Sequence, residues 1–198
     1  SDEGMTPREV TESHHMGSQY ADLVADMDRY PAICDDVGLF SFPPVINGKR
    51  TEVTENSRDL LIEMTGTDQW TIDHMLNIVL YSLSARGGRV ERVDVSYADD
   101  APGEYAGQTL SRPDFSVKEK SVTHDRIESI IGVALDPETV IDCVERAGLD
   151  ATQTEAEAGE IAYDVEIPPY RVDVLHPLDV IDDIGRAYGF NDLEPRYP

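Results

Sequence analysis

The most regular hydrophobic pattern in this chain is helical and lies between residues 72 and 83. Apolar side chains recur there three or four residues apart, at Ile72, Met75, Leu76, Val79, Leu80 and Leu83. Residues at this spacing share one face of an α-helix, and that face has to be buried against another layer. The segment 93–97 then alternates apolar with polar side chains, as a half-buried strand does. The first half of the chain is therefore predicted to pack helices on a mixed sheet.

Shorter elements surround this helix, and turn and cap residues set their bounds. Residues 5–29 have helical spacing, residues 30–34 and 39–42 predict a hairpin, and residues 60–64 predict a short apolar strand. Thr67 or Asp68 is expected to cap the long helix at its start, and Gly87 with Gly88 to end it.

The second half predicts a separate small domain. Residues 99–107 are rich in Asp, Pro and Gly, so we expect a boundary there, with one domain at 1–108 and another at 109–198. Two helices at 123–131 and 136–148 form a helix-turn-helix-like pair, and a strand at 161–167 and a helix at 177–188 follow. The pair has an acidic face, which favours packing over DNA binding. The fold class is predicted to be α+β.

Acidic residues outnumber basic ones throughout the chain. Forty Asp and Glu against sixteen Lys and Arg give a net charge of −24. Such a surface repels itself unless salt screens it, so the charge predicts a salt-adapted source. It also argues against nucleic-acid binding, although molar salt weakens that argument.

Other features bound the class of protein. Cys34 and Cys143 form neither a disulfide framework nor a zinc pattern, which favours a reducing, cytoplasmic location. No run reaches the roughly 20 apolar residues that a membrane span needs. The first residues contain neither an initiator methionine nor a signal peptide, and the last form a loop-like run, so we expect a piece of a longer chain.

Four aspartates near the last predicted helix are candidates for metal binding. In a helix that begins at Pro177, Asp179, Asp182 and Asp183 lie on one face, and Asp173 comes just before it. Like charges at this spacing repel, and Mg²⁺, which prefers carboxylate oxygens, would relieve the repulsion. From spacing alone a solvated acidic face is favoured, because acids are common here and stabilise a first helical turn.

The same segment resembles the B5 domain of phenylalanyl-tRNA synthetase β subunits. The resemblance rests on Pro168-Pro169-Tyr170, Arg171-Val172-Asp173, Asp179, Asp182-Asp183 and Tyr188-Gly189-Phe190-Asn191. It implies Mg²⁺ ligands at Asp173, Asp179, Asp182 and Asp183, with the metal shared with the α subunit. The adjacent acids are usually Glu-Glu or Glu-Asp in that family, so Asp182 has a shorter reach here.

Two upstream segments resemble the B3/B4 editing domain of the archaeal and eukaryotic-type β subunit. They are Phe42-Pro43-Pro44-Val45-Ile46-Asn47 and the run from Leu61 to Asp68. The resemblance implies hydrolysis of tRNA(Phe) mischarged with tyrosine. Our candidates for the pocket are Asn47, Gly48, Thr51, Glu52, Thr65, Gly66, Thr67 and Asp68. The alternatives are ordinary ones, since Asn-Gly is a common turn pair and Thr67 or Asp68 a good helix cap.

The chemistry expected of such a pocket is non-covalent. No Ser-His-Asp or Cys-His arrangement is evident, so positioned water and backbone donors are favoured over a covalent nucleophile. The resemblance further implies an α-subunit partner in a heterotetramer, tRNA(Phe) as the RNA partner, and no aminoacylation by this piece alone, because the ATP and phenylalanine site belongs to the α subunit. The alternative is a non-catalytic module that binds the α subunit or tRNA.

Overall fold

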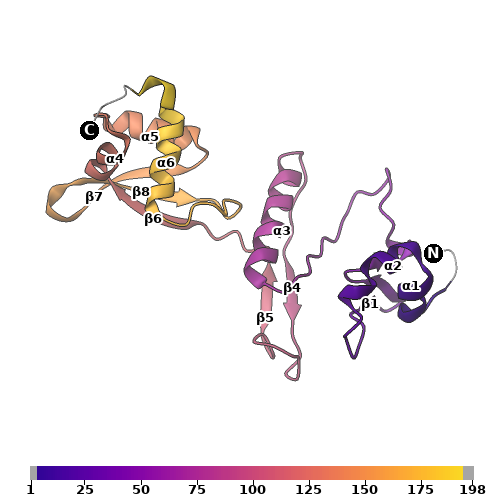
Figure 1. The fold of residues 1–198 in the computed structure, drawn as a ribbon. Helices are drawn as coiled ribbons and strands as arrows, with labels where there is room; N and C mark the ends of the chain where they lie inside the picture. The colour runs from indigo at the N-terminus through magenta and orange to yellow at the C-terminus, as the bar shows by residue number, and fades with distance from the viewer. Residues whose placement is uncertain (1–3, 194–198) are drawn as a thin grey trace. The chain divides into compact units, whose positions relative to one another are not determined.

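The chain forms two compact units, drawn in Figure 1, and the computed structural model describes residues 4–193. The N-terminal unit is Ser1–Thr67, and the C-terminal unit is Asp68–Pro198. The described residues contain six α-helices and three small sheets, and every strand pairing in those sheets is antiparallel. The α+β class is thus confirmed, with separate antiparallel sheets in the first half where one mixed sheet was expected.

The N-terminal unit begins with two short helices in place of one long one. Helix α1 (Pro7–Ser13) is capped by Thr6, and α2 (His15–Tyr20) follows after a break at His14, whose backbone is extended. A 3₁₀ turn, η1 (Ala21–Leu23), continues the chain. A Cβ atom at Gly17 would lie 1.7 Å from the carbonyl oxygen of Val10, so only glycine allows α1 and α2 to approach this closely.

A three-stranded sheet completes this unit. Strands β1 (Ile33–Asp35), β2 (Gly38–Phe42) and β3 (Ile46–Asn47) pair in that order. The predicted hairpin is confirmed, and its turn is held by the Asp35 carboxylate, which accepts from the backbone N–H of Val37 and Gly38. Three residues form the buried core of this sheet and its helices, namely Val24, Phe42 and Val45. The core is small, so each of these side chains contributes a large share of the stability.

The strand predicted at residues 60–64 does not form. Residues 52–67 contain no helix or strand, and Leu60 and Leu61 are 53% and 65% exposed. A strand is stabilised by a neighbouring strand, and none of the described residues pairs with this segment. The prediction was wrong because an apolar run alone does not supply a pairing partner.

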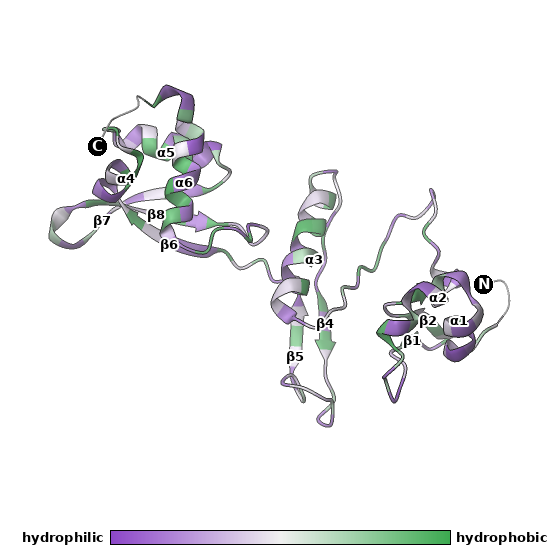
Figure 2. Ribbon diagram, viewed as in Figure 1, coloured by the Kyte–Doolittle hydropathy of each residue, from purple (hydrophilic) through white to green (hydrophobic). Residues whose placement is uncertain are grey.

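The long helix and a hairpin open the C-terminal unit. Helix α3 (Gln69–Ser84) begins at Asp68, whose carboxylate accepts from the Thr71 backbone N–H, so Asp68 rather than Thr67 is the cap. Strands β4 (Val93–Ser96) and β5 (Thr109–Arg112) pair, and Figure 2 shows hydrophobic residues on α3, β4 and β5. This hairpin spans residue 108, and the predicted domain boundary there stays a prediction.

The rest of the C-terminal unit is a three-stranded sheet covered on one face by three helices (Figure 1). The strand order is β6-β8-β7, with bounds β6 (Lys118–Thr123), β7 (Asp150–Glu155) and β8 (Ile161–Ile167). Along β8, Tyr163, Val165 and Ile167 are buried, whereas Asp164 and Glu166 are exposed. The alternation shows that β8 packs one face on the helices and turns the other to solvent.

The covering helices are α4 (His124–Ile131), α5 (Pro137–Arg146) and α6 (Pro177–Tyr188). Glycine ends α4, because Gly132 has a φ of 85°. Both helices of the predicted pair, α4 and α5, form as expected, and their apolar faces enter the core through Ile127, Val140 and Val144. The inner face of α6 adds Val180, Ile181 and Ile184 to the same cluster.

The solvent face of this sheet carries a row of acids across its strands. Glu166 on the central strand is paired with Glu119 of β6 and with Asp150 of β7. Side chains directly opposite on one face lie close together, so three carboxylates repel one another here.

We expect Glu166→Gln to stabilise the chain by a few tenths of a kcal/mol to about 1 kcal/mol in dilute salt, and by little in molar KCl, where the repulsion is screened. Denaturant unfolding at several KCl concentrations measures this. Glu155→Gln is the matched control, because Glu155 is opposite the apolar Ile161. An equal gain from both changes, or a gain that persists in molar salt, would contradict the prediction.

Candidate functional site

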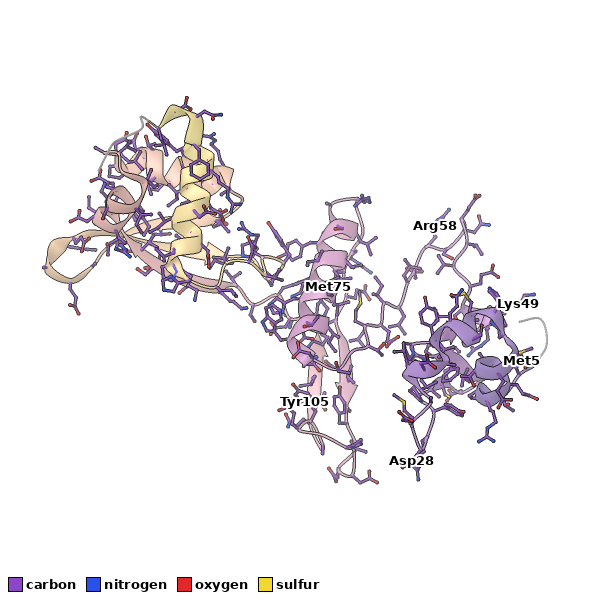
Figure 3. The ribbon with its side chains drawn as sticks, in the orientation of Figure 1. Met5, Asp28, Lys49, Arg58, Met75 and Tyr105 are labelled. Carbon is purple, nitrogen blue, oxygen red and sulfur yellow. The ribbon has the colours of Figure 1, made fainter. Side chains whose placement is uncertain are left out.

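Four of the eight predicted pocket residues line one cavity in the N-terminal unit. This cavity is a depression open to solvent, with a volume of about 620 Å³, and it is lined by Ile46, Asn47, Gly48, Lys49, Thr51, Glu52 and Val53. These residues come from β3 and from the 3₁₀ turn η2 (Lys49–Thr51), and Figure 3 marks Lys49 on this turn. The predicted residues Asn47, Gly48, Thr51 and Glu52 are therefore brought together.

The cavity wall is held by hydrogen bonds to strand β2. The buried hydroxyl of Ser41 donates to the Asn47 side-chain oxygen at 2.7 Å, and the backbone N–H of Gly48 donates to the Phe40 carbonyl at 2.7 Å. The Thr51 hydroxyl donates to the same Phe40 carbonyl at 3.2 Å. Among residues 4–193, the amide nitrogen of Asn47 donates to no protein group, so it is available to a ligand.

The ion pair beside this wall is structural. Arg50 binds both carboxylate oxygens of Asp35 at 2.9 Å. The guanidinium lowers the pKa of Asp35 to about 2. Asp35 therefore stays ionised at neutral pH and fixes the β1–β2 turn against η2.

The other four predicted pocket residues do not line this cavity. Thr65, Gly66 and Thr67 lie in the irregular stretch, and Asp68 caps α3. Glu63, which the sequence analysis did not single out, lies beside them: burial raises the pKa of its carboxyl, and the Thr65 hydroxyl, by hydrogen bonding, opposes the rise. No pattern in the sequence distinguishes Glu63 from the other acids, because its shifted pKa comes from burial.

Two of the four predicted metal ligands are engaged on α6 itself. One oxygen of Asp179 accepts from the backbone N–H of Leu175 at 2.8 Å and of His176 at 2.7 Å. The bond from His176 is one half of a capping box at the start of α6, and both bonds hold the pKa of Asp179 below its usual value. Asp182 pairs with Arg186 one turn later.

The other two, Asp173 and Asp183, share one arginine. Arg171 binds both oxygens of Asp173 at 2.8 Å and one oxygen of Asp183 at 2.6 Å. The Arg171 and Asp183 side chains are 16% and 11% exposed, whereas Asp173 is 60% exposed. The hydrogen bonds that Arg171 donates to Asp173 lower the pKa of Asp173, and the bonds that it donates to both carboxylates raise the pKa of Arg171.

This arrangement does not provide a preformed cation site. Within residues 4–193, no group of three or more His, Cys, Asp or Glu side chains is placed to hold a metal ion. Each of the four aspartates already has a partner in its own chain. The chain's own donors thus do not fit Mg²⁺ as they stand, and the predicted ligand set of Asp173, Asp179, Asp182 and Asp183 stays a prediction.

Part of the C-terminal unit matches a known domain family. Residues 120–190 match the tRNA synthetase B5 domain, which covers the sheet β6-β8-β7 and its three helices. The module that carries the four aspartates is therefore a B5 domain of the kind found in tRNA synthetases.

Three comparisons extend the relationship to the whole chain. The phenylalanine-tRNA ligase β subunit of Haloarcula marismortui is 73% identical over 198 residues, which is 100% of this chain and 34% of that protein. The β subunit of Halorubrum lacusprofundi is 65% identical over 98% of this chain and 33% of its own length. The crystal structure of an N-terminal fragment of the phenylalanyl-tRNA synthetase β subunit from Pyrococcus horikoshii superposes with a TM-score of 0.80 and 28% identity, covering 94% of this chain and 51% of that fragment.

These similarities relate the chain to phenylalanine-tRNA ligase β subunits, of which it spans about a third of the length, and it carries a B5 domain. Two of the relatives come from halophilic archaea, in agreement with the salt adaptation that the net charge predicts. Among the described residues, none of the helices has the length and apolar character needed to cross a membrane.

Proposed function

We propose that this chain is part of an enzyme, phenylalanine-tRNA ligase, and that its first 108 residues take part in hydrolytic editing of Tyr-tRNA(Phe). The observation that carries this proposal is the cavity at Asn47, Gly48, Thr51 and Glu52, within a chain similar along its length to β subunits. The second half, as a B5 domain, supports the α subunit in this proposal. The partners are the α subunit and tRNA(Phe), and the compartment is the cytoplasm.

Editing is needed because binding alone separates tyrosine poorly from phenylalanine. A pocket built for an apolar side chain rejects an analogue with one added hydroxyl by only about a hundredfold. A second site must therefore recognise the phenol hydroxyl with a polar group and hold the ester near a water molecule. In this proposal the amide nitrogen of Asn47, which has no partner among residues 4–193, donates to the substrate, because the side-chain oxygen of Asn47 already accepts from Ser41.

A deacylation assay tests the editing proposal. Tyrosylated tRNA(Phe) is incubated with the chain in high salt, and release of tyrosine is followed. We expect faster release than in buffer, and a loss of about 10-fold to 100-fold in Asn47→Ala, since removal of one positioned donor has effects of this size or larger. Asn56→Ala is the matched control, because Asn56 is an exposed asparagine of the same unit outside the cavity. Release at the buffer rate, or equal loss in both variants, would reject editing by this cavity.

The alternative is a non-catalytic module that binds the α subunit or tRNA. One observation favours an apolar contact: a cavity of about 300 Å³ beside α6 is lined by Ile130, Ile131, Leu178, Ile181, Asp182, Gly185, Phe190 and Leu193. Of these, Ile130, Leu178 and Phe190 are exposed. Exposed apolar groups that lie together are typical of protein contacts. Titration with purified α subunit, together with the deacylation assay, distinguishes the two hypotheses. Binding of the α subunit without release of tyrosine supports the non-catalytic module.

A further inference from the structure

The B5 domain contains its own cation between two of its carboxylates. The Arg171 guanidinium lies between Asp173 and Asp183 and donates three hydrogen bonds to their oxygens, with a fourth at 3.4 Å to the carbonyl of Ala147. Asp183 is on α6, Ala147 is at the end of α5, and Asp173 lies between β8 and α6. One side chain therefore connects three separate segments.

The burial of these groups makes the contact specific. Asp183 is 11% exposed and carries a charge that needs a partner, because an unpaired buried carboxylate is strongly destabilising. A guanidinium suits this position, since its planar fork can bind two carboxylates at once. A divalent cation that took both Asp173 and Asp183 would compete with Arg171 for their oxygens and weaken the pairing of that guanidinium, itself 16% exposed.

Asp179 and Asp182, the other two predicted metal ligands, are also already bound to groups of the chain. Asp179 uses one oxygen for two backbone N–H groups at the start of α6, and Asp182 is paired with Arg186. Binding of a metal by all four would therefore compete with three ion pairs, those of Arg171 with Asp173 and Asp183 and that of Arg186 with Asp182.

We propose that Arg171 supplies the positive charge that this carboxylate cluster needs. Arg171 binds both Asp173 and Asp183, and so it holds the segment after β8 against α6. With this charge in place, the domain folds without a divalent metal. The role is one of positioning, because Arg171 sets where the two carboxylates lie.

The first test uses the full 198-residue chain in high KCl, with millimolar MgCl₂ or with EDTA at matched ionic strength. Thermal unfolding is measured, together with hydrogen exchange of the peptides that contain α6. A ligand that binds only the folded state must raise the melting temperature. We expect the same melting temperature within about 1 °C and the same exchange in both buffers. A rise of several degrees with MgCl₂ would overturn the proposal.

Variants provide the second test. Arg171→Met keeps an apolar stem but removes the charge, so the melting temperature should fall by about 5–10 °C, and MgCl₂ should then restore part of the loss by pairing the freed carboxylates. Arg146→Met is the matched control, because it breaks an exposed ion pair with Asp142 on α5 of the same domain and involves none of the four aspartates, and it should change the melting temperature by about 1–2 °C at most without a response to MgCl₂.

Equal melting temperatures for wild type and Arg171→Met would also overturn the proposal. If Arg171→Met does not fold, Arg171→Lys replaces it, since lysine keeps the charge and loses the fork. A melting temperature of Arg171→Lys equal to that of the wild type would then count against the proposal. A melting temperature several degrees lower would support it.

Discussion

Replacing Phe42 by alanine is expected to unfold the N-terminal unit while the C-terminal unit stays folded. Phe42 is 2% exposed and is one of the three buried core residues among those described in this unit, and its ring meets Tyr30 edge to face, with centroids 5.5 Å apart. Truncating a buried phenylalanine to alanine costs about 3–5 kcal/mol, which is most of the stability that a small unit has. The two cores share no residue, so the loss should not spread.

Hydrogen exchange followed by mass spectrometry measures this outcome. Peptides from β2 should lose protection in Phe42→Ala, while peptides from β8 and α6 keep theirs. Leu39→Ala is the matched control, because Leu39 lies on the same strand and is 44% exposed. Protection of β2 at the wild-type level, or loss of protection in both units, would show that the small core does not hold the unit together.

The second large effect is expected in the B5 domain, at Ile184. This side chain is fully buried on α6 among the residues that join the helices to β8. Ile184→Ala should destabilise the domain by about 2–5 kcal/mol, because it removes apolar contacts and leaves a cavity. The larger end of this range is expected if the neighbouring side chains cannot move into the space.

Thermal unfolding in high KCl, read with hydrogen exchange of α6, measures the loss. Ile130→Ala is the matched control, since Ile130 is on α4 of the same domain but is 43% exposed, and it should cost less than about 1 kcal/mol. Comparable effects of the two changes would contradict the assignment of Ile184 to the core.

Helices were predicted well from the sequence because their signals are local. Apolar spacing and residues that favour helix starts placed α3, α4, α5 and α6 close to their observed bounds. Helix α3 starts at Asp68 and α5 at Asp136, each with a carboxylate that accepts from a backbone N–H. The one long helix expected at residues 5–29 is instead two, because the close approach at Gly17 is a contact between segments.

Edge strands could not be predicted in the same way. β8 is apolar on alternate residues and was found, but β6 (Lys118–Thr123) and β7 (Asp150–Glu155) were missed. Both are mostly polar and lie at the two edges of the sheet, where backbone pairing with β8 does most of the stabilising. Conversely, residues 60–64 are apolar enough for a strand and lack a pairing partner among the described residues.

The candidate sites, too, were predicted only in part from the sequence. Sequence motifs pointed to Asn47 and Gly48, and the structure places them in one cavity with Thr51 and Glu52. They also pointed to the four aspartates as a group, but could not show which partner each would have. That depended on Arg171, whose two partners come from either side of the α6 start.

The sequence by itself determined the α+β class, the capped helices, the central strand, the acidic surface and the likeness to synthetase β subunits, because each depends on neighbours along the chain. The tertiary structure alone decided which polar segments become edge strands, which predicted pocket residues share a cavity, and which carboxylates Arg171 pairs. The edge strands, the bonds from the cavity wall to β2 and the Arg171–Asp183 pair join different segments of the chain, and packing and charge pairing act between those segments rather than along the chain.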